Sequence, residues 1–244
     1  VYGTTATLEN VTMTNVANGL YIQNYAGKTI KVKNSTISSI AIWERSGYSG
    51  VQTFKFEGVN TVGTLSSSQY AKYVLTAEGA TLTAPEGSTV TTTVDGYKVA
   101  YGDGKYYLKP CDYVAEIEGG AKYESLQAAI DAAQDGDVIK VLEDITLGYE
   151  DAQDATVKTF FNVNTGKTIT IDLNGNNVKA VLEGDETVTA FFHISNSTNL
   201  TLKDLSDGNT GTVEIESEAY VSTLLCNDGG YLTVENGNYI LEKG

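Results

Sequence analysis

The stretch GKTITIDLNGN, residues 166–176, alternates apolar and polar side chains and ends at an Asn-Gly pair. Alternation with a period of two is typical of a β-strand with one buried face, and Asn-Gly supplies the positive-φ corner of a tight turn. A related pattern returns along the chain: two apolar residues flank a polar one, and an Asn, Asp or Gly follows. It occurs at 6–10, 30–34 and 54–58 in the first half, and at 169–173, 200–204 and 232–236 in the second.

The spacing of this pattern is nearly constant inside each half of the chain. Its last residues are 24 and 24 positions apart at Asn10, Asn34 and Gly58. They are 31 and 32 positions apart at Leu173, Asp204 and Asn236. Repeats of this length, each with several short strands, fit one coil of a β-solenoid better than a helical repeat. We therefore expect an all-β fold, a parallel β-helix, whose apolar ladders stack in coils about 4.8 Å apart.

One short amphipathic helix is predicted at 125–134. Ser125 suits the N-cap, Gly136 suits the C-terminal stop, and apolar residues follow at helical spacing: Leu126, Ala129, Ile130 and Ala133. The end coil of a solenoid exposes an unpaired edge. We expect the helix to cap the first coil of a second solenoid, whose first strand lies within 138–147.

The chain divides into three predicted parts. Residues 1–80 are expected to be the last coils of one β-helix, and 81–112 a closing, hairpin-rich connector. Residues 113–244 are expected to be the capped first part of a second β-helix. The junction is placed at Pro110-Cys111-Asp112. Both ends of the sequence fall inside a coil, which indicates a piece of a longer tandem array, coils that stack end to end between molecules, or two halves that meet.

Composition narrows the class of partners and the compartment. The net charge is −15 and the pI about 4.4, which argues against nucleic acid and suits an extracellular protein kept soluble by carboxylates. No apolar run is long enough to predict membrane insertion. Cys111 and Cys226 make no metal motif; two unpaired thiols are the simpler interpretation, and a disulfide remains open.

Several segments together resemble the pectin-lyase-like right-handed parallel β-helix superfamily, and more closely the adhesin-like β-helix repeat proteins of bacterial cell surfaces. They are GGAKYESLQAAIDAAQDGDVIKVLEDITL (119–147), GKTITIDLNGN (166–176), NLTLKDLSDGNTGTVEI (199–215) and LTVENGNY (232–239). TLTAPEGSTVTTTVDGYKVAYGDGKYYL (81–108) resembles the segment that closes such solenoids. The resemblance implies fold and location; its motifs are structural and carry little chemistry.

Enzymes of that superfamily cleave acidic polysaccharides with Ca²⁺ and an Arg or Lys base, or with clustered Asp residues supported by His, Arg or Lys. This chain has one arginine, Arg45, and one histidine, His193, in different halves. The alternation in TAFFHISNST predicts that His193 faces solvent, opposite Phe192 and Ile194. Since no second His or Cys stands at ligand spacing, a zinc site is not expected.

A tentative glycan-contact site is predicted in IWERSGYSG: Trp43 and Tyr48 as stacking platforms, with Glu44 and Arg45 as polar contacts. The alternative is an ordinary turn between coils with one exposed aromatic ring.

A tentative Ca²⁺ site is predicted at Glu150, Asp151 and Asp154, because Ca²⁺ requires several oxygen ligands around one point. The alternative is a solvated acidic loop. Two further acidic groups, Glu183, Asp185 and Glu186 in a loop and Glu214, Glu216 and Glu218 on one strand face, are expected to form negative outer surface. No other cofactor is expected.

The sequence thus predicts a non-catalytic, extracellular β-solenoid segment of a bacterial surface protein, acting as a rigid stalk or as a module that binds glycans or a host surface. Two alternatives stay open. One is a polysaccharide lyase or glycoside hydrolase of the same fold. The other is a subunit that self-associates by stacking coils through open ends.

Overall fold

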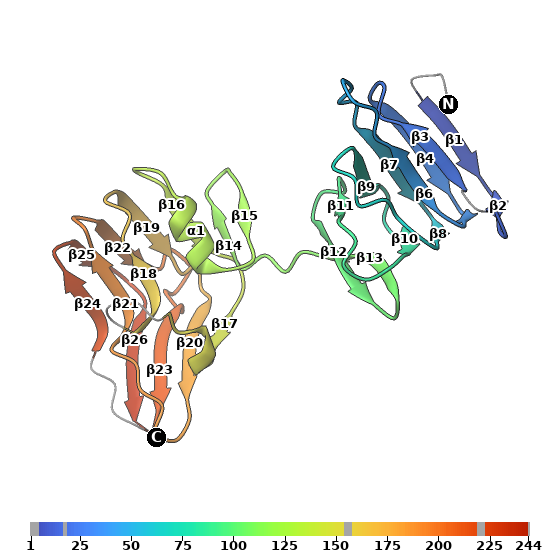
Figure 1. Ribbon diagram of the computed structural model, residues 1–244. Coiled ribbons are helices and arrows are strands. Elements are labelled where there is room, and N and C mark those ends of the chain that lie inside the picture. The colour runs from blue at the N-terminus through green and yellow to red at the C-terminus, as the bar shows by residue number, and fades with distance from the viewer. Residues whose placement is uncertain (1–4, 17–18, 154–157, 219–222, 244) are drawn as a thin grey trace. The chain divides into compact units, whose positions relative to one another are not determined.

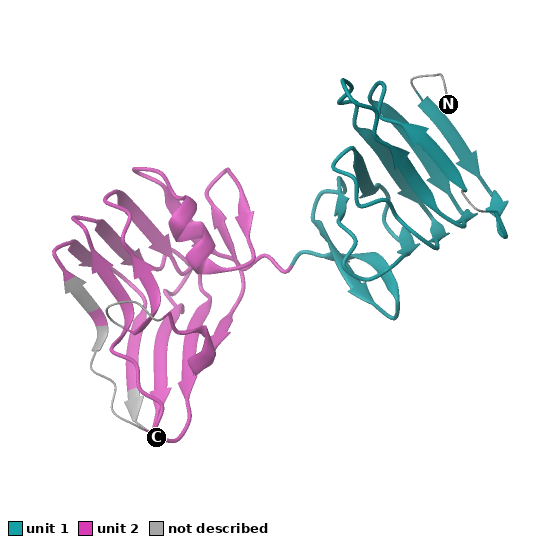
Figure 2. Cartoon of the chain, in the orientation of Figure 1, with its two compact units in different colours: residues 1–111 teal, residues 112–244 magenta. Residues whose placement is uncertain are grey.

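The computed structural model describes residues 5–16, 19–153, 158–218 and 223–243 (Figure 1). The chain forms two compact units, unit 1 (Val1–Cys111) and unit 2 (Asp112–Gly244), each with its own hydrophobic core (Figure 2). Apart from the helix α1 (Leu126–Ala132) and the 3-10 turn η1 (Tyr149–Asp151), the regular structure of the described residues is β, as the sequence predicts. None of the helices described there is long and apolar enough to cross a membrane.

The described residues of unit 1 form three sheets. The first has the order β1-β4-β7-β9-β11 and is parallel throughout. The second runs β2-β5-β8-β10 in parallel and continues antiparallel through the hairpin β13-β12; the third is the parallel pair β3-β6. The strands are β1 (Thr5–Glu9), β2 (Thr12–Met13), β3 (Leu20–Gln23), β4 (Lys28–Lys33), β5 (Thr36–Ile37), β6 (Ile40–Trp43), β7 (Gln52–Glu57), β8 (Val59–Val62), β9 (Ala71–Leu75), β10 (Thr81–Thr83), β11 (Val90–Thr92), β12 (Tyr97–Gly102) and β13 (Lys105–Pro110).

In unit 2, the part of the chain that is described also forms three sheets. The parallel series β16-β19-β22-β25, β17-β20-β23-β26 and β18-β21-β24 place consecutive strands of the chain in consecutive sheets, and the antiparallel hairpin β14-β15 covers the free edge of β16. The strands are β14 (Ala115–Ile117), β15 (Lys122–Tyr123), β16 (Val138–Val141), β17 (Ile145–Leu147), β18 (Thr159–Val163), β19 (Thr168–Asp172), β20 (Asn177–Leu182), β21 (Ala190–Ser195), β22 (Asn199–Lys203), β23 (Thr212–Ser217), β24 (Thr223–Asp228), β25 (Tyr231–Val234) and β26 (Asn238–Lys243).

The repeat spacing of unit 1 has a direct structural counterpart. Asn10, Asn34 and Gly58 end successive strands of the first sheet and have φ angles of 56°, 47° and 65°. This left-handed conformation favours Asn and Gly, since other side chains are strained there. At Gly58 a Cβ would also overlap Oδ1 of Asn34, so the corner admits only glycine without rearrangement.

The inward ladders of unit 1 build its core. Register pairs Ile30 with Phe54 and Phe54 with Tyr73, and these three side chains are buried. The rings of Phe54 and Tyr73 stack with centroids 5.4 Å apart. Burial raises the pKa of Tyr73 to about 12, against the smaller effect of its hydrogen bond to the Ser66 carbonyl, so the hydroxyl remains a donor at neutral pH.

Helix α1 covers the first strand of one sheet of unit 2. The side chain of Ser125 caps the helix by accepting from the Ala128 N–H, and the predicted apolar stripe is buried. Gln127 extends outward to β18: its Oε1 accepts from N of Asn162 (2.9 Å) and its Nε2 donates to O of Asn162 (3.0 Å). A side-chain amide thus supplies hydrogen bonds that a neighbouring strand would otherwise make.

Replacing Gln127 with Ala should destabilise unit 2 by about 1–2 kcal/mol, because the Asn162 backbone then lacks both partners. Urea unfolding followed by circular dichroism measures the change. Gln134→Ala, at an exposed glutamine just after α1, is the control and should change stability less. Equal effects of the two substitutions would contradict an edge-covering role for Gln127.

The prediction that His193 faces solvent is wrong. Only 7% of the residue is exposed, and Phe191, Phe192 and Ile194 beside it are fully buried. β21 is the middle strand of its sheet and is buried on both faces, so apolar and polar residues do not mark an inside and an outside there. Nδ1 and Nε2 of His193 have no hydrogen-bond partner among the residues that the structure describes.

Candidate functional site

Two exposed aromatic rings meet on unit 1, where β3 and β6 pair in parallel. Tyr21 on β3 and Trp43 on β6 stack with ring centroids 6.4 Å apart and an angle of 17° between their planes. Tyr21 is 55% exposed and Trp43 is 44% exposed. Because exposed apolar surface is informative where it is contiguous, these two stacked rings are a candidate contact surface.

A second aromatic pair follows in the loops after these strands. Tyr25 and Tyr48 lie with ring centroids 4.5 Å apart, and Tyr25 is 59% exposed. The guanidinium carbon of Arg45 lies 5.2 Å from the centre of the Tyr48 ring, in cation–π range. We call Tyr21, Tyr25, Trp43 and Tyr48 the aromatic face.

The loop that carries Arg45 and Tyr48 is fixed by a buried asparagine of the preceding turn. Oδ1 of Asn24 accepts from N of Arg45 (2.7 Å), and Nδ2 of Asn24 donates to O of Tyr48 (2.8 Å). N of Gly50 donates to O of Asn24, and a Cβ at Gly50 would overlap the backbone of Ala26. The two loops are therefore packed in direct contact, and the rings on them are positioned before any ligand arrives.

The four residues predicted as a glycan-contact site lie together, but with partners that the sequence did not reveal. Trp43 stacks on Tyr21 and Arg45 lies over Tyr48, while Oε1 of Glu44 accepts from Oγ of Ser68 (2.5 Å) in the next turn. Sequence reasoning missed Tyr21 and Tyr25. For Tyr25 the sequence contains a signal. When the sequence is shifted by the 24-residue repeat, Tyr48 aligns with position 24, which is next to Tyr25.

Formal charge is divided unequally between the units. Unit 1 has nine Lys and Arg against seven Asp and Glu, a net charge of +2; unit 2 has seven against 24, a net charge of −17. The aromatic face therefore belongs to the unit that lacks a strong net charge. Arg45 and His193, the two residues considered for catalysis, belong to different units.

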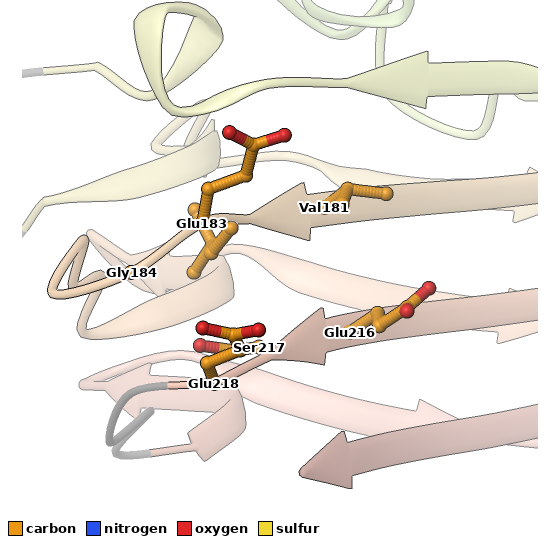
Figure 3. A pocket seen from close by; sticks show the side chains of 7 residues that line it. Val181, Glu183, Gly184, Glu216, Ser217 and Glu218 are labelled. Carbon is orange, nitrogen blue, oxygen red and sulfur yellow. The ribbon is translucent and has the colours of Figure 1, made fainter. Parts of the chain in front are cut away.

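An acidic pocket of about 430 Å³ lies in unit 2 along β20 and β23, lined among others by Glu183, Glu216 and Glu218 (Figure 3). Figure 3 shows these carboxyl groups spread along the pocket and not directed at one point. Nζ of Lys179 lies 2.6 Å from Glu216 and 2.9 Å from Glu214, and these hydrogen bonds raise the pKa of Lys179. One carboxylate of the pocket is therefore already paired.

The structure describes two of the three residues that were predicted to bind Ca²⁺. Asp151 ends the turn η1, where its Oδ2 accepts from N of Gly148 (2.8 Å), and Glu150 folds back over Gly148. Asp154 lies outside the described residues. Within the described ranges, no group of three His, Cys, Asp or Glu side chains is arranged to hold a metal ion. Calcium binding stays a prediction.

The prediction of unpaired thiols can be compared with the structure at one of the two cysteines. Cys111, at the end of unit 1, has a free and partly buried thiol. The side chain of Cys226 lies outside the part of the chain that is described.

Fold and site together define an all-β protein of mainly parallel sheets that carries an exposed aromatic face on one unit. No protein-family model, curated protein or solved structure matches the chain.

Proposed function

We propose that this protein is a non-catalytic β-solenoid module of a bacterial surface protein, and that unit 1 binds glycans through its aromatic face. In this proposal each unit is a right-handed parallel β-helix. Three observations support it: strands consecutive in the chain belong to consecutive sheets, strands one repeat apart pair in parallel, and positive-φ corners recur at the repeat spacing.

The aromatic face is the observation that carries the binding function. A pyranose ring presents flat patches of C–H groups, which pack on aromatic rings, and a rim of hydroxyls, which hydrogen-bond to polar neighbours. Tyr21, Trp43 and Tyr25 offer exposed rings, with Glu44 and Arg45 beside them. Because Asn24 fixes the loop in advance, little ordering entropy is lost on binding.

The extracellular location follows from the same proposal. A stiff stack of turns with binding loops on its side suits presentation of a contact surface away from a cell, and loops can vary while the ladders stay constant. The strong negative charge of unit 2 favours solubility.

Trp43→Ala should weaken glycan binding about five- to thirtyfold, because a stacking aromatic residue contributes about 1–2 kcal/mol at such a site. A glycan array identifies ligands, and calorimetry on the strongest one gives the Kd of each variant. Val59→Ala is the control, because Val59 is 66% exposed on β8 of the same unit and lies outside the aromatic face.

Two results would contradict the proposal. One is undiminished binding by Trp43→Ala. The other is the release of new reducing ends or unsaturated products from a bound glycan, which would favour the lyase or hydrolase alternative.

A further inference from the structure

A recess lies next to the aromatic face, on unit 1. It has a volume of about 470 Å³ and is formed by the loops at 65–69 and 86–89. Six of the twelve residues that line it are Ser, Thr or Gln: Ser66, Ser67, Ser68, Gln69, Ser88 and Thr89. A recess of this size rich in neutral donors and acceptors suits a ligand that itself carries many hydroxyl groups.

The walls of this recess are held by hydrogen bonds from two buried tyrosines. The hydroxyl of Tyr73 donates to O of Ser66 (2.9 Å), and the hydroxyl of Tyr106 donates to O of Pro85 (3.0 Å). Oγ of Ser88, which lines the recess, also donates to O of Pro85 (2.7 Å). The recess is therefore formed in advance, as the aromatic face is.

The recess continues the aromatic face along the stack of turns. A parallel bridge joins Ile40 on β6 to Leu65. The segment that begins at Leu65 therefore lies beside the segment that carries Trp43, one repeat further along the stack. The hydrogen bond from Ser68 to Glu44 connects the two regions directly. Successive turns are about 4.8 Å apart, comparable with the length of one sugar residue in an extended chain.

The charged groups along this path balance one another. Arg45 and Glu44 stand at the aromatic face, and Lys72 and Glu86 line the recess. Such a path offers no excess of cations to neutralise a polyanion, so charge does not favour uronic-acid or sulfated chains.

We propose that the aromatic face and this recess form one elongated site that takes a linear, uncharged oligosaccharide lying along the stack of turns. The inference rests on the proposed function. It adds the chemical class of the ligand and a second subsite: the rings hold one end of the chain by stacking, and the serine-rich recess holds the next residues by hydrogen bonds.

The test is a length series. Uncharged β-1,4-linked gluco- and manno-oligosaccharides, from disaccharide to hexasaccharide, are titrated calorimetrically, with oligogalacturonides as the acidic comparison. Affinity should rise about tenfold or more between the shortest and longest bound members of one uncharged series, and acidic chains should bind more weakly. Ser67→Leu, which fills the recess from an exposed loop position, should remove this gain but leave disaccharide binding unchanged.

Thr7→Leu, the same kind of change on the exposed face of β1, is the control and should preserve the gain. A gain that survives Ser67→Leu, a series without any gain, or tighter binding of oligogalacturonides would overturn the elongated site while the aromatic face still binds. If no chain binds, or if Trp43→Ala changes none of the affinities, the proposed function itself fails.

Discussion

Phe54→Ala is expected to destabilise unit 1 by about 3–5 kcal/mol, the range for removing a fully buried phenylalanine ring. Phe54 is 0% exposed in the middle of its sheet, between Ile30 and Tyr73 on the neighbouring strands. Loss of the ring leaves a cavity that adjacent strands cannot close, since their spacing is set by backbone hydrogen bonds. Because domains are stable by only about 5–15 kcal/mol, much of the stability of unit 1 would be lost.

Urea unfolding measures this loss, and hydrogen exchange read by mass spectrometry locates it. Amides of β4, β7 and β9 should exchange faster, while amides of unit 2 keep their protection because the two cores are separate. Phe54→Leu, which retains most of the volume, should cost less. Thr53→Ala, beside it on the half-exposed face, should cost little. Equal loss of protection in both units would contradict separate cores.

Asp204→Ala should destabilise unit 2 by about 3–5 kcal/mol, since each buried donor left without an acceptor costs about 1–3 kcal/mol and such costs are not fully additive. Asp204 is 0% exposed. Its Oδ1 accepts from N of Gly175 (2.9 Å) and N of Ser206 (3.0 Å), and its Oδ2 accepts from N of Gly211 (2.6 Å). One carboxylate thus satisfies three backbone groups in the loops that follow β19 and β22.

Urea unfolding at neutral pH compares this variant with Asp207→Ala, an exposed aspartate in the same loop that should change stability by less than about 0.5 kcal/mol. Asp204→Asn should lie between them, because the amide keeps one acceptor oxygen. A cost for Asp204→Ala no larger than for Asp207→Ala would show that water or other groups replace the carboxylate.

The same carboxylate gives a pH dependence. Burial alone raises the pKa of Asp204, but the hydrogen bonds from Ser206, Gly211 and Gly175 outweigh burial, so the pKa is lowered from its ordinary value of 3.8. A lowered pKa in the folded state means that the stabilisation is present above the unfolded pKa and is lost as pH falls through the folded one. Wild-type stability should therefore fall more steeply below about pH 4 than that of Asp204→Asn, measured as urea midpoints across a pH series.

The sequence predicted features that depend on local pattern. Hydrophobic periodicity and turn chemistry are properties of neighbouring residues, so the sequence shows them directly. They account for the apolar ladders, the corners at Asn10, Asn34 and Gly58, and the helix near 125–134. His193 could not be placed this way, because burial of β21 on both faces depends on its central position in a sheet formed by distant segments.

The candidate site was predicted only in part for the same reason. Trp43, Glu44, Arg45 and Tyr48 are adjacent in sequence, so their gathering in one loop was visible. Tyr21, Tyr25 and Ser68 contact these residues from other segments of unit 1, and Asn24 holds the loop by hydrogen bonds. Such contacts require the stacking register, which depends on loop lengths that differ from one turn to the next.

The position of Trp43 has a practical consequence. The chain contains a single tryptophan, and that indole is 44% exposed within the aromatic face. A molecule that settles on the face removes water from this one fluorophore, so arrival of a ligand would shift its emission without any attached dye. The protein therefore contains its own optical reporter, and collections of soluble sugars can be screened on the unlabelled wild-type chain.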